Sequence, residues 1–246
     1  MFHTVAYQGT GIAATDVDMT PITDGLMTIQ NGHFLPQSDA KLLYACVAGL
    51  TQTYAQIVTP TLRQICKHQI RPLENAAAPG TLPAYARYDR NPLTLKGLEE
   101  ISIVMQNTGV AVVKAILGLS LTPIMPAPQG NIFTLRGTGT TTQAALGWTS
   151  CAITWSDTLP TGNYVCVGLS AFAATCQAAR LTFEGQWERP GCIGNAVVTA
   201  QEWPFFRNGN LGIWGNFHSY RMPSLEFLST AADTAQTVFL DLIRVG

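Results

Sequence analysis

The segment that decides the fold is residues 237–245, TVFLDLIRV, near the end of the chain. Its side chains fall into two alternating sets, and both sets contain large apolar residues, such as Leu240 and Ile243. A two-residue alternation is typical of a β-strand, and apolar residues in both sets indicate that both faces of the strand are covered. We therefore expect this strand to lie centrally in a buried sheet.

Comparable short segments precede it as far back as residue 97, separated by Gly, Pro, Asn and Ser. The turn at residues 107–109 predicts a hairpin between the first two strands. Uneven connections between the others favour a two-sheet sandwich over a simple meander. The predicted strands are residues 100–105, 111–119, 132–135, 148–155, 164–172, 180–183, 211–214, 225–228 and 238–243.

The first 96 residues have a different pattern. Turn-forming residues are scattered through residues 1–36, between candidate short strands at residues 4–7 and 26–29, which predicts an extended arm that pairs with another segment or subunit. Apolar side chains from Leu42 to Val58 recur at spacings of three and four, which predicts an amphipathic helix over residues 39–58. The predicted domains are the arm (1–36), a helical segment with a Pro-rich loop (37–96), and one β-sandwich (97–246).

A second, short helix is expected directly after the first. Thr59 and Pro60 suit the N-cap and the first turn of a helix that ends near Cys66. Arg63, Lys67 and His68 lie on its exposed side or at its end. A solvated helix face is the ordinary explanation for such a basic group, and an anion site is the alternative.

The composition predicts that contacts with other chains cover much of the surface of this protein. Charged residues make up 12% of the 246 residues, against roughly 25% in an average soluble domain. A surface so poor in charge favours self-assembly, and the alternative is an ordinary domain whose surface is covered by Thr, Asn and Gln. The formal net charge is −1, and no Lys or Arg precedes Lys41, so we expect no basic arm that binds nucleic acid. We also expect neither a secretory signal nor an apolar run of membrane-spanning length.

The six cysteines show no Cys-x-x-Cys pair and no histidine at zinc-ligand spacing. They are Cys46, Cys66, Cys151, Cys166, Cys176 and Cys192. Most have apolar neighbours, which predicts buried, reduced thiols and an intracellular site of assembly. A disulfide that involves Cys151 or Cys166 stays open as an alternative.

No residues form a recognisable catalytic, metal or cofactor motif. His218 is a candidate general base, although an exposed loop histidine is the commoner situation. Glu99 with Glu100, and Glu184 with Glu188, are candidate glycosidase pairs, although solvated carboxylates are commoner. We therefore expect the protein not to be an enzyme and to need no cofactor.

Aromatic residues concentrate in three places: residues 85–90, 186–192 (QWERPGC) and 202–217. Aromatic side chains near Arg are typical anchors of subunit contacts. The predicted interface residues are Tyr85, Tyr88, Trp187, Trp203, Phe205, Phe206, Trp214 and Phe217. Three alternatives remain open: base stacking by Tyr85 and Tyr88, a small core that plugs one end of the sandwich, and a sugar-stacking platform of tryptophans.

Residues 97–246 resemble the jelly-roll coat proteins of icosahedral viruses. The resemblance is carried by residues 237–243, by the connection rich in Trp, Pro and Gly, and by the low charge. The acidic arm without Lys or Arg fits tailless viruses with an internal membrane better than viruses whose coat arms bind RNA. The implied fold is mainly β, a jelly-roll-like antiparallel β-sandwich with an N-terminal extended arm and one or two amphipathic helices.

The same resemblance implies a structural capsid subunit. Its partners would be sister copies, as a trimer or a larger assembly up to a shell, together with other virion proteins. Its location would be the virion, after assembly in the host cytoplasm, and membrane contact is left open. The alternative function is a ligand-binding β-sandwich, either a carbohydrate-binding or a trimeric cytokine-like module. That module would stack its ligand on Trp187, Trp203 and Trp214.

Overall fold

The computed structural model describes residues 2–48, 52–70, 85–144, 147–195 and 204–245. The chain divides into two compact units. We call residues 5–121 the N-terminal sandwich, and residues 122–246 together with residues 1–4 the C-terminal sandwich. The unit boundary falls between residues 121 and 122, and not at residue 97 as the sequence suggested.

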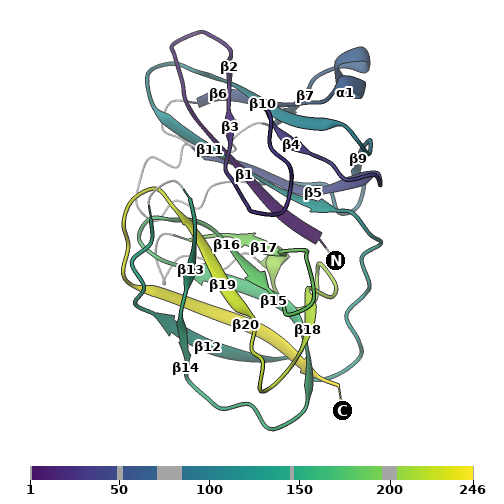
Figure 1. Cartoon of the computed structure of the whole chain (residues 1–246), viewed down its shortest axis with the longest axis vertical. Coiled ribbons are helices and arrows are strands. Elements are labelled where there is room, and N and C mark those ends of the chain that lie inside the picture. Colours follow the sequence, from purple (N-terminus) through teal and green to yellow (C-terminus); the bar gives the residue numbers. More distant parts are fainter. Residues whose placement is uncertain (1, 49–51, 71–84, 145–146, 196–203, 246) are drawn as a thin grey trace. The chain divides into compact units, whose positions relative to one another are not determined.

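The N-terminal sandwich has two sheets (Figure 1). One has the order β3-β1-β11-β5-β8, with β9 also paired to β5, and the other has the order β2-β10-β6-β7, with β4 also paired to β10. The elements are β1 (Phe2–Thr10), β2 (Val17–Asp18), β3 (Thr20–Pro21), β4 (His33–Phe34), β5 (Ala40–Ala48), β6 (Gln52–Val58), α1 (Pro60–Ile65), β7 (His68–Ile70), β8 (Tyr85–Arg87), β9 (Leu93–Leu95), β10 (Glu100–Asn107) and β11 (Val112–Ser120).

The C-terminal sandwich also has two sheets, with the orders β14-β12-β20-β15-β18 and β13-β19-β16-β17. Figure 1 shows β20 between β12 and β15. The elements are β12 (Phe133–Gly139), β13 (Trp148–Cys151), β14 (Ile153–Trp155), β15 (Asn163–Phe172), β16 (Cys176–Thr182), β17 (Gly191–Ile193), the 3-10 helix η1 (Pro204–Phe206), β18 (Gly215–His218), β19 (Ser224–Ser229) and β20 (Gln236–Arg244).

Both sandwiches are jelly rolls with one strand order. If the eight principal strands of each are numbered along the chain, one sheet reads 1-8-3-6 and the other 2-7-4-5. The eight are β1, β2, β5, β6, β7, β8, β10 and β11 in the first sandwich, and β12, β13 and β15–β20 in the second. This arrangement of two four-stranded sheets is the jelly-roll architecture. The mainly β, jelly-roll-like fold is therefore confirmed, but it occurs twice in the chain.

The predicted helix over residues 39–58 is wrong. Those residues form β5 and β6, which lie in different sheets. The side chains of Leu42 to Val47 are all buried, so β5 is covered on both of its faces. A strand buried on both faces is a continuous apolar run, and such a run satisfies helical spacing as well as strand spacing. The short helix is confirmed: α1 begins at Pro60, and the Leu62 N–H donates to the Thr59 hydroxyl at 3.2 Å.

The predicted N-terminal arm is also corrected, because residues 1–36 contribute strands to the first jelly roll. β1 pairs with β3 and lies beside β11, while β2 and β4 pair with β10. The first residues are held in the C-terminal sandwich. The Thr4 N–H donates to the Arg189 carbonyl at 3.0 Å, and Arg180 donates to the Thr4 carbonyl at 3.3 Å.

Most predicted strands of the C-terminal sandwich are present, with shifted ends. The predicted strand at residues 211–214 is displaced, since the observed strand β18 starts at Gly215. The hairpin between residues 100–105 and 111–119 is wrong, because β10 and β11 belong to different sheets. β20 is central, and both of its faces are covered, as predicted: Leu240 is fully buried on one face and Ile243 is 2% exposed on the other.

Candidate functional site

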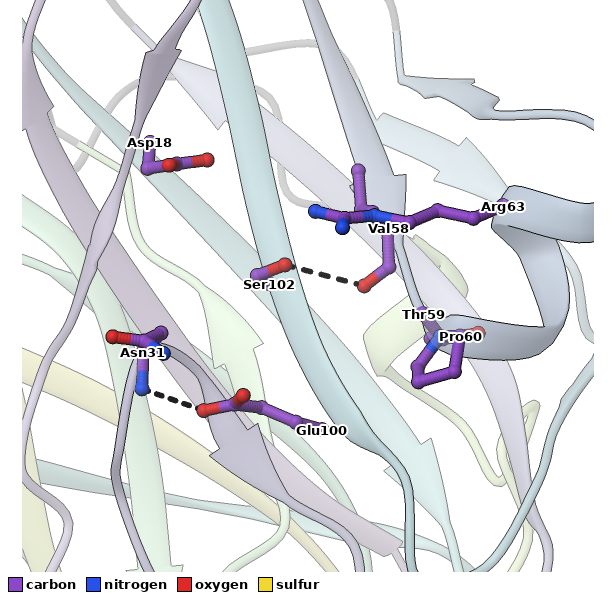
Figure 2. Close-up of a pocket in the computed structure, with 8 residues that line it drawn as sticks. All are labelled: Asp18, Asn31, Val58, Thr59, Pro60, Arg63, Glu100 and Ser102. Carbon is purple, nitrogen blue, oxygen red and sulfur yellow. Dashed lines mark hydrogen bonds between the residues drawn. The ribbon is translucent and has the colours of Figure 1, made fainter.

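A polar pocket lies on the outer face of the sheet β2-β10-β6-β7 in the N-terminal sandwich (Figure 2). Its volume is about 570 Å³. Four segments build it: β2, the loop before β4, β10, and the junction of β6 with α1. The lining residues are Asp18, Asn31, Val58, Thr59, Pro60, Arg63, Glu100 and Ser102.

The floor of the pocket follows from strand alternation. In β10, Ile101 and Ile103 point into the core, so Glu100 and Ser102 point outward. Ser102 pairs with Val58 of β6, and its hydroxyl donates a long hydrogen bond of 3.4 Å to the Val58 carbonyl. Figure 2 shows Arg63 reaching from α1 towards this floor, with Asp18 on the other side of β10.

Two backbone N–H groups hold Glu100 in place. Its Oε1 accepts hydrogen bonds from the N–H groups of Asn31 and Gly32, each at 2.6 Å. Gly32 permits this approach, because a Cβ at that position would lie 2.0 Å from the Ile101 carbonyl oxygen. The loop therefore fixes one oxygen of the Glu100 carboxylate and thereby sets the direction of the other.

Three of the four carboxylates that the sequence offered as glycosidase pairs have structural partners of their own. Glu99 Oε1 accepts from the Thr61 N–H at 3.1 Å and from the Thr61 hydroxyl at 2.5 Å, so it anchors α1. Glu184 forms an exposed ion pair with Arg221. Glu188 is 6% exposed. Neither pair is therefore arranged around a common open site.

His218 ends β18 and lines a second, smaller pocket of about 310 Å³. Its Nδ1 accepts a hydrogen bond from the Tyr220 N–H at 3.3 Å, and the two rings lie 4.9 Å apart. The other lining residues are Glu184, Asn216, Phe217 and Arg221. None of these five residues carries a hydroxyl or thiol group.

Four of the eight predicted interface residues are core side chains. Phe205, Phe206, Trp214 and Phe217 are 2%, 1%, 0% and 8% exposed. Trp214 packs edge-on against Phe2, with ring centroids 5.0 Å apart. Because all four are buried within the chain, their assignment as interface anchors is corrected, and Trp214 is removed from a sugar-stacking platform. Trp203 lies outside the described residues.

The three remaining aromatics keep accessible surface. Trp187 is 44% exposed and lies against His3, with ring centroids 5.8 Å apart. Tyr85 and Tyr88 are half-buried. The Tyr88 hydroxyl lies 2.5 Å from His68 Nε2, and burial lowers the pKa of His68 and raises that of Tyr88. Their role at an interface stays a prediction.

The C-terminal sandwich contains a buried ionic cluster that was not predicted from the sequence. Arg207 donates from Nε and Nη2 to the two oxygens of Asp241, each at 2.7 Å. Asp241 also accepts from the Thr134 hydroxyl and the Asn208 N–H, both at 2.8 Å. The signal was present, because Asp241 is the one charged residue among the large apolar side chains from Val238 to Ile243 of the central strand. A carboxylate buried there needs a charged partner.

The cysteines agree with the expectation of buried thiols, with one exception. Five are buried and Cys66 is exposed, and all six lie in the described part of the chain, where none forms a disulfide. Burial raises the pKa of Cys46, Cys166 and Cys192 to about 12. Such thiols stay protonated and unreactive at neutral pH.

Among the described residues, no cluster of three or more His, Cys, Asp or Glu side chains is arranged to hold a metal ion. The helices described contain no segment long and apolar enough to span a membrane.

No family model and no curated protein matches the sequence. A search of solved structures aligns the chain with the crystal structure of the major capsid protein P2 from bacteriophage PM2. The two are 12% identical, the alignment covers 100% of this chain and 98% of that chain, and the TM-score is 0.27. A TM-score this low does not show a shared fold, so the jelly-roll assignment stands on the strand orders of this chain.

Proposed function

We propose that this chain is a structural subunit that assembles with sister copies, as a viral capsid protein. The observation that carries the proposal is the pair of jelly rolls with one strand order in a single chain. Jelly rolls occur in viral capsid domains, lectins and cupins. The low content of charged residues, 12%, favours the viral capsid domain among these classes. A surface that is covered by sister copies does not need charged residues to stay soluble.

An exposed apolar surface gives the assembly a physical starting point. Ile12, Val110 and Val112 are 56%, 78% and 52% exposed, and we call these three residues the apolar tip. A hydrogen bond of 2.9 Å from the Gly11 N–H to the Ala111 carbonyl holds their two loops together. Residues 8–15 and 107–113 contain no charged side chain. Grouped apolar side chains of this kind are typical of surfaces that another chain covers.

On this proposal the partners are sister copies in a trimer or a larger assembly, up to a shell, and other virion proteins. The location is the virion, after assembly in the host cytoplasm. Tyr85, Tyr88 and Trp187 are the aromatic anchors that remain available to such contacts.

A charge placed on the apolar tip should weaken association. Sedimentation velocity over a concentration series should show wild-type species of trimer size or larger. Val110→Asp should raise the dissociation constant by at least about 10-fold, because covering one unpaired carboxylate costs more than about 1.4 kcal/mol. Thr158→Asp, on an exposed loop of the other sandwich, is the matched control and should associate as wild type does. A monomer at every concentration would contradict the proposal.

A further inference from the structure

The polar pocket of the N-terminal sandwich has the size of a ligand site. Its volume of about 570 Å³ lies within the range of about 300–1,000 Å³ found for small-molecule sites. It opens on the outer face of a sheet whose inner face holds the core residues Ile101, Ile103 and Met105. The paired strands and the tethered loop therefore set the backbone positions of its lining residues.

The two opposite charges of the pocket do not neutralise each other. Within the described residues, no ion pair or side-chain hydrogen bond occupies Arg63 or Asp18. In Figure 2 they approach the pocket from opposite sides, Arg63 from α1 and Asp18 from β2. Each therefore has hydrogen-bonding capacity to offer a ligand that sits between them.

The floor of the pocket offers further hydrogen-bond acceptors. Glu100 uses Oε1 for the two backbone N–H groups, which leaves Oε2 for the pocket. The Ser102 hydroxyl donates to Val58, so its lone pairs are left to accept. Beside them on the same face is Gln56, 8% exposed, whose Oε1 has no hydrogen-bond partner in the described part of the chain.

The charge balance selects the kind of ligand. Asp18, Glu100 and Arg63 give the pocket two carboxylates and one guanidinium, which leaves one net negative charge. An anion would be attracted by Arg63 but repelled by the two carboxylates. A cation would be attracted by the carboxylates but repelled by Arg63. A hydroxyl group donates to a carboxylate and accepts from a guanidinium at the same time, so adjacent hydroxyls suit both sides of the pocket.

We propose that this pocket binds a neutral sugar, one hexose unit of a glycan. Asp18 and Glu100 would accept from its hydroxyls, and Arg63 would donate to them. The site is separate from the tryptophan platform that the sequence suggested, since every lining residue belongs to the N-terminal sandwich. It is also independent of the capsid proposal, because it needs only one chain.

Saturation-transfer NMR and calorimetry with glucose, galactose, mannose and N-acetylglucosamine test the proposal, with sialyllactose and inorganic phosphate as anionic probes. At least one neutral sugar should bind saturably, with a dissociation constant on the order of 1 mM. Asp18→Asn and Arg63→Gln should each weaken that binding by at least about 10-fold, because each removes charge-assisted hydrogen bonds.

Asp157→Asn and Arg136→Gln make the same changes of side chain at exposed positions of the other sandwich, and they should bind as wild type does. Asp18 and Arg63 are exposed, so their variants should keep the wild-type melting temperature. The proposal is overturned if no neutral sugar binds, if only sialyllactose or phosphate binds, or if the Asp18 and Arg63 variants bind as tightly as wild type.

Discussion

Replacing Asp241 by alanine is expected to lower the free energy of unfolding of the C-terminal sandwich by about 3–5 kcal/mol. Arg207, with only 8% of its side chain exposed, would lose both of its 2.7 Å bonds to the carboxylate, and with them the charge that is bonded to its guanidinium in this cluster. The cluster also holds the segment after η1 against the sheet, because the Asn208 N–H donates to the same carboxylate. Gly168 makes room for this contact, since a Cβ there would lie 2.7 Å from Asp241 Oδ2.

Tryptophan fluorescence during urea unfolding measures this effect cleanly. All five tryptophans lie in residues 148–214, within the C-terminal sandwich, so the signal reports on that unit. Glu184→Ala is the matched control, because it breaks the exposed ion pair with Arg221, and such pairs contribute at most about 1 kcal/mol. A loss below about 1 kcal/mol for Asp241→Ala would show that the cluster does not stabilise the unit.

The same cluster predicts a dependence of stability on pH. Burial raises the pKa of Asp241, but hydrogen bonds from Arg207, Asn208 and Thr134 outweigh burial and hold it below its usual value. A carboxyl whose pKa is lower in the folded state contributes stability above its unfolded pKa, about 3.9, and this contribution is lost as the pH falls through the folded pKa. Acid should therefore destabilise the wild type more than Asp241→Asn.

Trp214→Ala is expected to destabilise the C-terminal sandwich by about 3–5 kcal/mol, because it removes a large, fully buried side chain and leaves a cavity. The lost contacts include the edge-on packing against Phe2, at 5.0 Å between ring centroids. Urea unfolding followed by the four remaining tryptophans measures the change. Trp187→Ala is the control: at 44% exposure it should cost far less stability.

These two tryptophans also separate the two interpretations of the aromatic segments. If Trp214 served a subunit contact, its loss would change the size of the assembly and leave the stability of the single chain intact. The structure predicts the reverse for Trp214. For Trp187, a weaker assembly at unchanged chain stability would support its role as an interface anchor.

The sequence predicted correctly those elements whose pattern of apolar residues or capping residues lies within the element itself. The alternation of residues 237–245 identified β20 and its covered faces, and Thr59 with Pro60 marked the start of α1. β5 was mistaken for a helix because burial on both faces removes the alternation. The separation of β10 from β11 is a matter of sheet pairing over long distances in the chain, which the turn between them does not encode.

The candidate site was harder to predict because it is assembled from four segments. Glu100 and Arg63 were both noticed, one as half of a carboxylate pair and the other as part of a basic helix face. Nothing in the spacing from Asp18 to Ser102 shows that β2, β6 and β10 are neighbours in one sheet. Residues 39–58 form β5 and β6 and not a helix, and β6 places the start of α1 beside β10. The side chains of Asp18, Glu100 and Arg63 thereby line one pocket on the outer face of the sheet β2-β10-β6-β7.

Negative-stain electron microscopy of the purified full chain at high concentration tests the central claim most directly. We predict discrete, regular particles, each built from at least three copies of the 26.5 kDa chain, as capsomers or closed shells. Fields that contain only separate single chains, with light scattering that gives the mass of one chain in the same sample, would contradict the proposal that these two jelly rolls build a shell.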